Sequence, residues 1–194
     1  MFKSKLNTIK KVLLAVISAI LCIAVAGCGS GSDNTNTKPQ ENTDSGAQST
    51  IDEPSHKIKF TMKDGGEFII KTEPQYAPET CKNFTNLVSE GFYNGLTFHR
   101  VIDNFVAQGG DPKGNGTGGS DKTIRGEFSK NGVENNISHK RGVISMARSP
   151  QDNNSASSQF FIMHKDGDYL DGSYAAFGHV SEGMDVVDKI AENT

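Results

Sequence analysis

The chain has 194 residues, which is enough for one ordinary folded domain. Its 20 Lys and Arg residues stand against 23 Asp and Glu residues, which gives a formal net charge of −3. Because a protein that binds nucleic acid needs a positively charged surface for the phosphates, this balance argues against a nucleic-acid partner.

The first 27 residues have the pattern of a secretory signal. Four lysines, namely Lys3, Lys5, Lys10 and Lys11, precede a mostly apolar run from Val12 to Ala26. This run has the length of a signal-peptide core, about 7–15 residues, and is short for a membrane-spanning helix, which needs roughly 20. It ends in Val-Ala-Gly-Cys, which resembles a bacterial lipobox and predicts cleavage before Cys28. The Cys28 thiol would then carry a diacylglycerol anchor, with palmitate as the expected acyl group; the alternative is a plain cleaved signal.

Cleavage at this point changes the cysteine count and the charge. Cys22 leaves with the signal and Cys28 is lipidated, so Cys81 remains as a single thiol that cannot form an internal disulfide. Cys81 lies among the apolar residues of a helical pattern, which predicts core packing rather than nucleophilic chemistry. The signal contains four of the twenty basic residues and no acidic residue, so the mature chain has 16 basic and 23 acidic residues and a formal net charge of −7.

A tether is predicted over residues 28–55. The stretch from Gly29 to Ser55 is rich in Gly, Ser, Asn, Asp, Thr and Gln and has almost no large apolar residue. It cannot bury enough apolar surface to offset the loss of chain entropy, which predicts a disordered segment. A flexible coil of this length spans on the order of 30 Å. Together with the anchor, it predicts a domain held at the extracytoplasmic face of the cell membrane.

A folded domain is predicted over residues 56–194. Lys57–Met62 alternates polar and apolar residues, as a half-buried strand does. An Asp-Gly-Gly turn at 64–66 and a second alternating stretch, Glu67–Thr72, complete a hairpin.

A helix is predicted from Pro78, which suits a first helical turn, to a stop at Gly91. A strand follows over Thr97–Gln108, with a bend near Asp103 and Asn104. The remaining predicted elements are short strands at Gly142–Ala147, Gln159–His164 and Ala175–Val180 and a second helix at Gly183–Glu192. Many short strands with two helices favour a barrel or sandwich closed by helices.

Six segments within this domain form a specific pattern. They are Phe98–Ile102, Phe105–Asp111, Gly116–Gly119, Ile144–Ala147, Ser158–Ile162 and Tyr169–Gly172. In this order and spacing they resemble the cyclophilin family of peptidyl-prolyl cis–trans isomerases. The resemblance runs from about Ile58 to the end of the chain, and six segments in order are far more specific than one.

The resemblance implies a mainly β fold, a closed eight-stranded antiparallel barrel capped by two helices. The family continues past the second helix into a final strand, whereas the sequence stops at Thr194, so we expect the domain over 56–194 to be C-terminally incomplete. It also implies an isomerase, monomeric and without cofactor or metal. Its partners would be proline-containing unfolded or flexible polypeptides, which in the predicted location are secreted or surface proteins.

The resemblance also implies the site. Arg100 would stabilise the twisted X–Pro amide, Gln108 would orient Arg100 and contact the substrate backbone, and Phe105 would hold the proline ring. The implied substrate-binding residues are Val106, Gly116, Ala147, Arg148, Gln159, Phe161, Tyr169, Leu170 and Tyr174.

Four of these positions depart from the best-known eukaryotic pattern. Val106 stands in place of a methionine, Tyr169 of a tryptophan and Tyr174 of a histidine. Arg148 replaces an asparagine and changes the charge of the groove that binds the residues before the proline. Because Val106 and Arg148 both alter the groove, a second hypothesis stays open, a module that binds proline-containing partners with little turnover.

Two other patterns are weighed against this site. The loop over Gly114–Gly119 lacks a Gly-Lys-Ser/Thr ending and does not open a helix, so it does not predict a phosphate cradle. The five histidines are far apart and show no metal-ligand spacing. His99 should point to the strand face opposite Arg100, which predicts packing or a hydrogen bond within the barrel.

Overall fold

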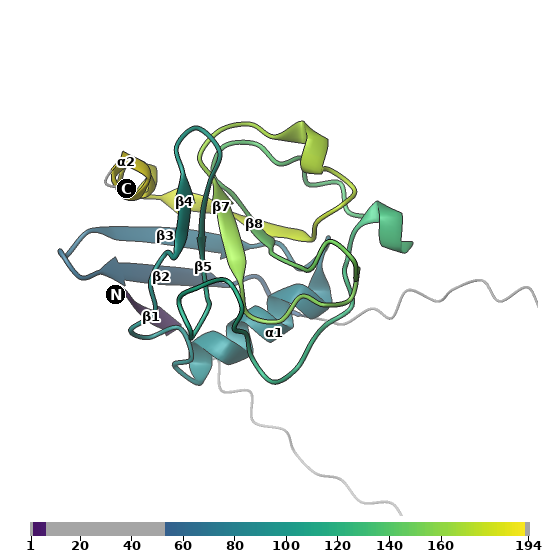
Figure 1. The fold of residues 1–194 in the computed structure, drawn as a ribbon, viewed down its shortest axis with the longest axis horizontal. Coiled ribbons are helices and arrows are strands. Elements are labelled where there is room, and N and C mark those ends of the chain that lie inside the picture. Colours follow the sequence, from purple (N-terminus) through teal and green to yellow (C-terminus); the bar gives the residue numbers. More distant parts are fainter. Residues whose placement is uncertain (1, 7–52, 193–194) are drawn as a thin grey trace, which may run out of the picture. The chain divides into compact units, whose positions relative to one another are not determined.

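A computed structural model describes residues 2–6 and 53–192 (Figure 1). Most of the predicted signal, Cys28 and most of the predicted tether lie outside the described residues. In chain order the elements are β1 (Phe2–Leu6), β2 (Lys57–Met62), β3 (Glu67–Thr72), α1 (Pro78–Ser89), β4 (Arg100–Ile102), β5 (Val106–Gly109), the 3-10 helix η1 (Ser129–Asn131), β6 (Val143–Met146), β7 (Phe160–Met163), the 3-10 helix η2 (Asp168–Leu170), β8 (Ala176–Glu182) and α2 (Met184–Glu192).

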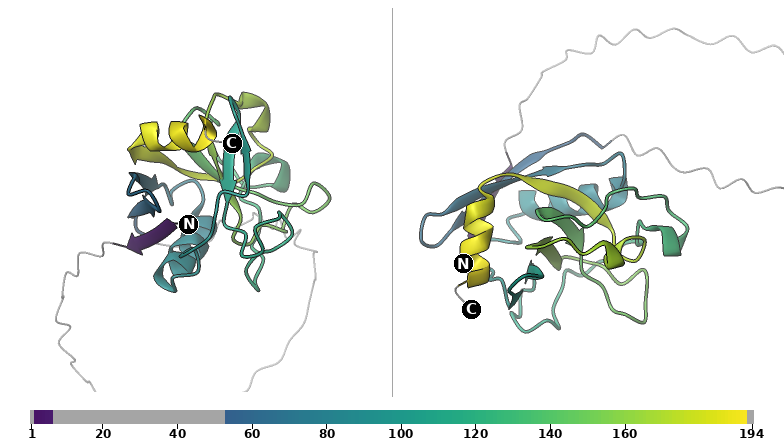
Figure 2. Two further views of the ribbon diagram at one scale, coloured as in Figure 1. Left: turned by 60° about the vertical axis from the view of Figure 1, so that its left-hand side comes forward. Right: turned by 90° about the horizontal axis from the view of Figure 1, so that it is seen from above.

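The strands form one antiparallel sheet in the order β1-β2-β3-β8-β6-β7-β5-β4. The sheet curls, and α1 and α2 lie at opposite ends of it (Figures 1 and 2). The predicted mainly β architecture with two helices is therefore confirmed. Over residues 2–6 and 53–192, β1 and β4 are the outer strands with one neighbour each, so the described sheet does not show the closed barrel. No helix in these ranges is long and apolar enough to span a membrane.

The strand β1 comes from the stretch predicted as a signal. It pairs antiparallel with β2, from Phe2 opposite Met62 to Leu6 opposite Ile58. The sequence pattern did not predict this strand, because its lysines fit the charged start of a signal peptide equally well. Its pairing covers the backbone of β2 on the side away from β3.

The hairpin of β2 and β3 has the predicted turn. Gly65 adopts a φ of 89°, a conformation that suits glycine, and the amide of Gly66 donates a 3.0 Å hydrogen bond to the Asp64 carboxylate. The register places Phe60 opposite Phe68, and their rings stack with centroids 4.5 Å apart. The turn thus fixes which aromatic residues face the core.

The helix α1 obtains its N-terminal cap from a distant segment. Its first residue is Pro78, as predicted, but the preceding Ala77 has no side chain that can accept a hydrogen bond. The carboxylate of Glu127 accepts from the backbone N–H groups of Glu79 (3.0 Å) and Thr80 (2.7 Å) instead. Since the first N–H groups of a helix have no partner within the helix, this long-range cap ties α1 to the loop before η1.

The larger core lies between α1 and the sheet. Phe160 is fully buried and makes edge-to-face contacts with Phe60, Phe84 and Tyr93 at centroid distances of 5.4–5.9 Å. Cys81 is also fully buried in this core, as its helical position predicts. Burial raises the pKa of the Cys81 thiol far above its usual range, which keeps the thiol protonated.

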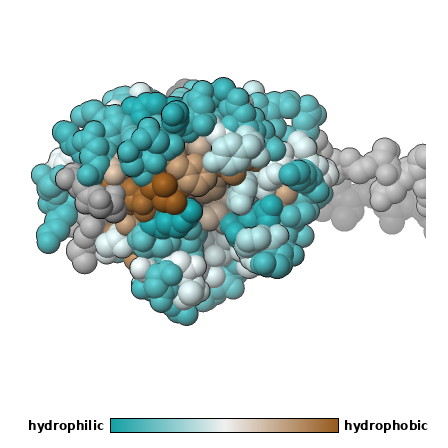
Figure 3. Space-filling model, turned by 45° about the horizontal axis from the view of Figure 1, so that its top comes forward, coloured by the Kyte–Doolittle hydropathy of each residue, from teal (hydrophilic) through white to brown (hydrophobic). Residues whose placement is uncertain are grey.

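A smaller apolar cluster lies on the other side of the sheet. Its buried members are Val106, Val143, Phe161, Met163, Leu170 and Ala176. Successive residues of a strand point to opposite faces, so Phe160 and Ile162 enter the larger core while Phe161 and Met163 enter the smaller one. On the face turned toward the viewer in Figure 3, apolar residues gather near the middle, with hydrophilic residues above and below them.

Candidate functional site

Strand register brings the predicted site residues into one row. Arg100 on β4 lies opposite Gln108 on β5, Gln108 lies opposite Phe161 on β7, and Phe161 lies opposite Ser145 on β6. Direct cross-strand partners have neighbouring side chains on the same face of a sheet. The row therefore places a guanidinium, an amide, a phenyl ring and a hydroxyl side by side, although they are up to 61 positions apart in the chain.

The row borders a small hollow of about 180 Å³, here called the ring pocket. Its lining comprises nine of the predicted site residues: Arg100, Phe105, Val106, Gln108, Ala147, Arg148, Phe161, Leu170 and Tyr174. Phe161 is 6% exposed and Leu170 9%, so the apolar floor is largely withdrawn from water, while Arg100 stays exposed at the edge. The Arg100 guanidinium carbon lies 6.0 Å from the centroid of the Phe105 ring. An apolar pocket with a cation at its mouth can hold a ring and polarise an adjacent polar group.

A groove of about 390 Å³ adjoins the ring pocket. It shares Gln108, Ala147 and Arg148 with that pocket, and it is lined further by Gly116, Thr117, Gly118, Ser149, Pro150, Ser155, Ser157 and Gln159. Gly116 and Gln159, both predicted, thus belong to the groove. Sequence patterns gave no reason to single out the serines at 149, 155 and 157, because polar loop residues are usually solvated wherever they lie.

A chain of side-chain amides connects Arg100 to the glycine-rich loop. Arg100 Nη1 donates to Gln108 Oε1 (3.3 Å), and Gln108 Nε2 donates to Gln159 Oε1 (2.9 Å). Gln159 Nε2 then donates to the backbone carbonyls of Gly116 (3.0 Å) and Gly118 (2.7 Å). Gln108 thereby holds Arg100, the role that the resemblance implies for it, and the groove residues support Gln108 in turn. We call this set the amide chain.

The glycine-rich loop is folded around the carboxylate of Asp111. This carboxylate accepts from the backbone N–H groups of Lys113 (2.7 Å), Asn115 (3.0 Å) and Gly116 (2.6 Å). Burial tends to raise the pKa of Asp111, but the backbone N–H groups lower it below its usual range. A side chain at Gly118 would collide with the same carboxylate, which accounts for glycine there. The loop N–H groups therefore bind a carboxylate of the chain itself and do not form a phosphate cradle.

A buried polar group supports the ring pocket from behind. His139 is 1% exposed, and its Nδ1 lies 2.7 Å from Asp171 Oδ1 while its Nε2 lies 3.1 Å from Ser145 Oγ. Its ring stacks on Phe161 at a centroid distance of 6.1 Å. Ser145 is fully buried, so these three residues cannot act on a substrate as a nucleophile and its base. The signal available in the sequence was a serine inside the apolar run Val143–Met146.

Tyr169 and His99, both discussed from the sequence, lie outside the linings of the two hollows. Tyr169 is 72% exposed and its ring stacks on Phe105 at 6.1 Å, so it extends the rim. The two ring nitrogens of His99 are buried without a hydrogen-bond partner among the described residues, so packing rather than a hydrogen bond holds this side chain.

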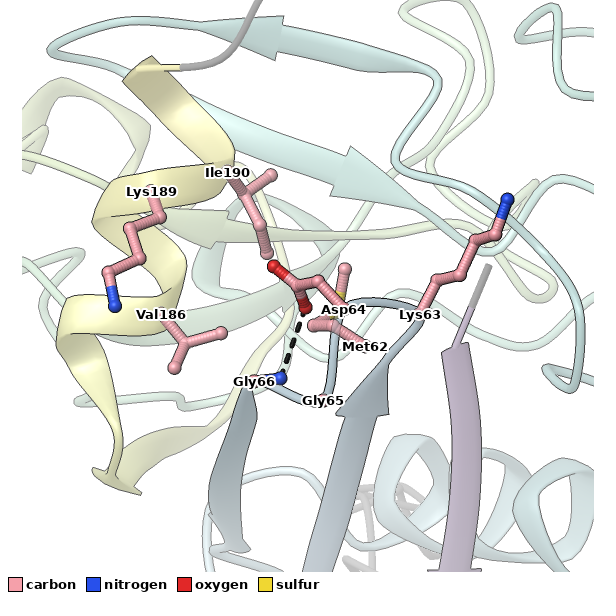
Figure 4. A pocket seen from close by; sticks show the side chains of 8 residues that line it. All are labelled: Met62, Lys63, Asp64, Gly65, Gly66, Val186, Lys189 and Ile190. Atoms are coloured by element: carbon pink, nitrogen blue, oxygen red, sulfur yellow. Dashed lines mark hydrogen bonds between the residues drawn. The ribbon is translucent and has the colours of Figure 1, made fainter.

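A larger hollow, about 720 Å³, lies elsewhere. It is formed between the turn of β2 and β3 and the helix α2 (Figure 4), and its lining includes Met62, Val186 and Ile190. It contains neither an aromatic ring nor an arginine, so the smaller ring pocket has the richer chemistry. In residues 2–6 and 53–192 no group of three or more His, Cys, Asp or Glu side chains is arranged to hold a metal ion.

Comparison with known proteins gives a consistent result. Residues 57–194 match the family model described as cyclophilin type peptidyl-prolyl cis-trans isomerase/CLD. The chain is 44% identical over 126 residues to peptidyl-prolyl cis-trans isomerase B of Bacillus subtilis, covering 65% of this chain and 84% of the relative. It is 48% identical over 118 residues to a peptidyl-prolyl cis-trans isomerase of Helicobacter pylori, covering 60% and 69%.

A solved structure is also similar. It is the crystal structure of a Cryptosporidium parvum cyclophilin type peptidyl-prolyl cis-trans isomerase in the presence of the dipeptide Ala-Pro. The two share 30% sequence identity with a TM-score of 0.59, over 64% of this chain and 78% of the other.

Proposed function

Because the chain belongs to the cyclophilin-type peptidyl-prolyl cis-trans isomerases, we propose that it accelerates X–Pro bond rotation in secreted or surface proteins as they fold. It is a peptidyl-prolyl cis-trans isomerase. The observation that supports the proposed mechanism is Arg100, held by Gln108 at the mouth of an apolar pocket. A proline-containing ligand fits such a pocket, and the similar structure was determined in the presence of Ala-Pro.

The proposed chemistry follows from the nature of the amide bond. Rotation about the C–N bond faces a barrier of about 18–20 kcal/mol, because the nitrogen lone pair is conjugated with the carbonyl. In the twisted state the lone pair returns to the nitrogen, which can then accept a hydrogen bond. A guanidinium N–H from Arg100 directed at that nitrogen stabilises the twisted state more than either planar state, and this difference lowers the barrier.

The apolar residues hold the ring during this rotation. Phe105, Val106, Phe161 and Leu170 contribute apolar lining and bring no acceptor that would compete for the arginine. The remainder of the peptide then turns relative to a fixed proline. Binding the ring raises the share of encounters in which the nitrogen is within reach of Arg100.

We also propose the setting in which this activity occurs. The signal-like residues 1–27 and the lipobox before Cys28 support export and lipid anchoring at the extracytoplasmic face of the cell membrane. The polar stretch 28–55 would then act as a tether. For the domain over residues 56–194 we propose the closed eight-stranded barrel of the family; seven of the described strands, β2 to β8, belong to this domain.

Exchange spectroscopy tests the mechanism. An NMR measurement of cis–trans exchange in an Ala-Pro peptide gives the rate with catalytic amounts of the full chain, and Arg100→Ala is compared with wild type. We expect kcat/KM to fall about 100- to 1,000-fold, the usual loss when one donor to a transition state is removed. Arg125→Ala is the matched control, since Arg125 is an exposed arginine outside both hollows.

Equal rates for wild type and Arg100→Ala would overturn the role of Arg100. A wild-type protein that shifts the peptide resonances without exchange between the cis and trans signals would instead support the binding module. The anchor is tested separately: Cys28→Ala should abolish incorporation of radiolabelled palmitate in cells, and retained label would contradict lipidation.

A further inference from the structure

Arg148 is a cation fixed in place where the ring pocket meets the groove. Its Nε donates to the carbonyl of Ser173 and its Nη1 to the carbonyl of Ser149, both at 2.9 Å. Its guanidinium carbon lies 4.9 Å from the ring centroid of Tyr174 and 5.2 Å from that of Phe128. Two hydrogen bonds and two aromatic rings therefore set the position of the charge before any ligand binds.

Arg148 lines both hollows. The ring pocket and the groove have Arg148 in their shared wall, together with Gln108 and Ala147. A peptide whose proline fills the ring pocket and whose chain continues past this wall enters the groove. Side chains on that part of the peptide then pass close to the guanidinium.

The charged side chains that line the two hollows are all positive. Among the described residues, Arg100 and Arg148 are the only charged side chains in either lining. Neither forms an ion pair with a described carboxylate, whereas Arg141 elsewhere binds Asp188 through two nitrogens at 2.7 and 2.8 Å. The chain as a whole carries a formal net charge of −3, so the site has the opposite sign to the protein around it.

We infer that Arg148 determines specificity. With the residues before the proline in the groove, as the resemblance implies, Arg148 favours peptides with a carboxylate side chain one or two residues before the proline and disfavours those with an ammonium group there. This inference rests on the proposed function and names a substrate class for the same site. Its backbone hydrogen bonds account for two of the five guanidinium N–H groups, so others can donate to a carboxylate. Because the cation is already ordered, binding the carboxylate costs little further side-chain entropy.

A purely structural role for Arg148 makes a different prediction. Arg148 joins the backbone at Ser149 to the backbone at Ser173, so its loss could loosen the wall for every peptide alike. Loosening would lower the activity without changing the ranking of peptides. The ranking is therefore the readout that separates the two roles.

The test uses capped peptides that differ in a single residue. Glu, Gln or Lys is placed one or two positions before the proline, and kcat/KM is measured by exchange NMR with the full chain, beside Kd from chemical-shift titration. We expect Glu above Gln and Gln above Lys, by roughly three- to fivefold per step at low salt, as for a partly exposed ion pair. The spread should shrink at 0.5 M salt because the charges are screened.

Two substitutions and one control complete the design. Arg148→Lys keeps the charge and should keep the ranking, while Arg148→Gln should give nearly equal values for the three peptides. Arg125→Gln, outside both hollows, should rank them as wild type does. A wild type with no ranking, or an Arg148→Gln variant that ranks them as wild type does, would overturn the inference. If the protein accelerates cis–trans exchange in none of the peptides, the proposed function fails. The Kd values for the three peptides then still decide whether Arg148 gives the charge preference.

Discussion

Removing the carboxylate at the centre of the glycine-rich loop should destabilise the protein and weaken catalysis together. In Asp111→Ala three backbone N–H groups lose an acceptor that now lies 2.6–3.0 Å away. A hydrogen bond to a charged group contributes about 1.5–3 kcal/mol. Three such bonds would exceed 4 kcal/mol, but part of this is offset because the buried carboxylate no longer has to be desolvated and water reaches the loop. We expect a loss of about 3 kcal/mol, measured by urea unfolding at pH 7, and a fall in Tm of about 10 °C.

The same substitution should reach Arg100 through the amide chain. The carbonyls of Gly116 and Gly118 hold Gln159, so a disordered loop loosens Gln159, Gln108 and the guanidinium in turn. We expect kcat to fall about tenfold under conditions in which the variant is fully folded, since Arg100 remains present but is less well oriented.

A matched control and the pH dependence make this prediction refutable. Asp121→Ala, at an exposed position just past the loop, should change stability by less than about 0.5 kcal/mol. Because the folded pKa of Asp111 is below its unfolded value, its contribution is full above about pH 4 and is lost as the pH falls through the folded pKa. A loss below 1 kcal/mol for Asp111→Ala at pH 7, or a loss as large at pH 2, would refute the reasoning.

Three further predictions concern groups away from the pocket mouth. Glu127→Ala should cost about 2 kcal/mol in urea unfolding because two N–H groups at the start of α1 lose their cap, with Glu127→Gln intermediate; equal stabilities would contradict the capping role. Burial lowers the pKa of His139 and outweighs the opposing effect of Asp171. As the pH falls, the imidazole is therefore protonated in the unfolded chain at a higher pH than in the folded protein. Stability should therefore fall as the pH drops below about 6.5, and His139→Gln should reduce that slope; an unchanged slope from pH 5 to 7.5 argues against it. Cys81 should react with a thiol reagent at pH 8 only when the protein is unfolded, and labelling of the native domain at the rate of a small thiol would be inconsistent with its burial.

Local sequence patterns predicted most of the secondary structure. The alternation of polar and apolar residues located β2 and β3, and Pro78 correctly marked the first residue of α1. These signals could be used because they depend on neighbours along the chain. The strand predicted over Thr97–Gln108 is in fact two strands, since Asn104 adopts a φ of 56° and the bend becomes a hairpin turn. The strand β8 continues to Glu182, beyond its predicted end, because it pairs with β3 across an irregularity at Ile69 and Ile70.

The site could be predicted only in part. The resemblance supplied the residues of the ring pocket, and the structure brings eleven of the twelve predicted residues to the two hollows. Glu127 and His139 could not be predicted as buried groups, because the fold and not the sequence spacing places distant partners, Glu79 and Asp171, beside them. Asp111 binds backbone N–H groups within five residues of itself, but its burial has no signal in the sequence. A buried carboxylate and a solvated one look alike in a sequence.

The hydrogen bonds of the amide chain all run in one direction, and this links changes in the loop to the orientation of Arg100. Glycine carbonyls at one end can only accept and the guanidinium at the other can only donate, so both glutamines have one permitted orientation. Reversing either amide would set two donors or two acceptors against each other at both of its ends. Changes in loop sequence that move the Gly116 or Gly118 carbonyl can therefore alter the orientation of the Arg100 guanidinium through Gln159 and Gln108. Related chains could in this way diverge in rate while the residues that line the ring pocket stay the same.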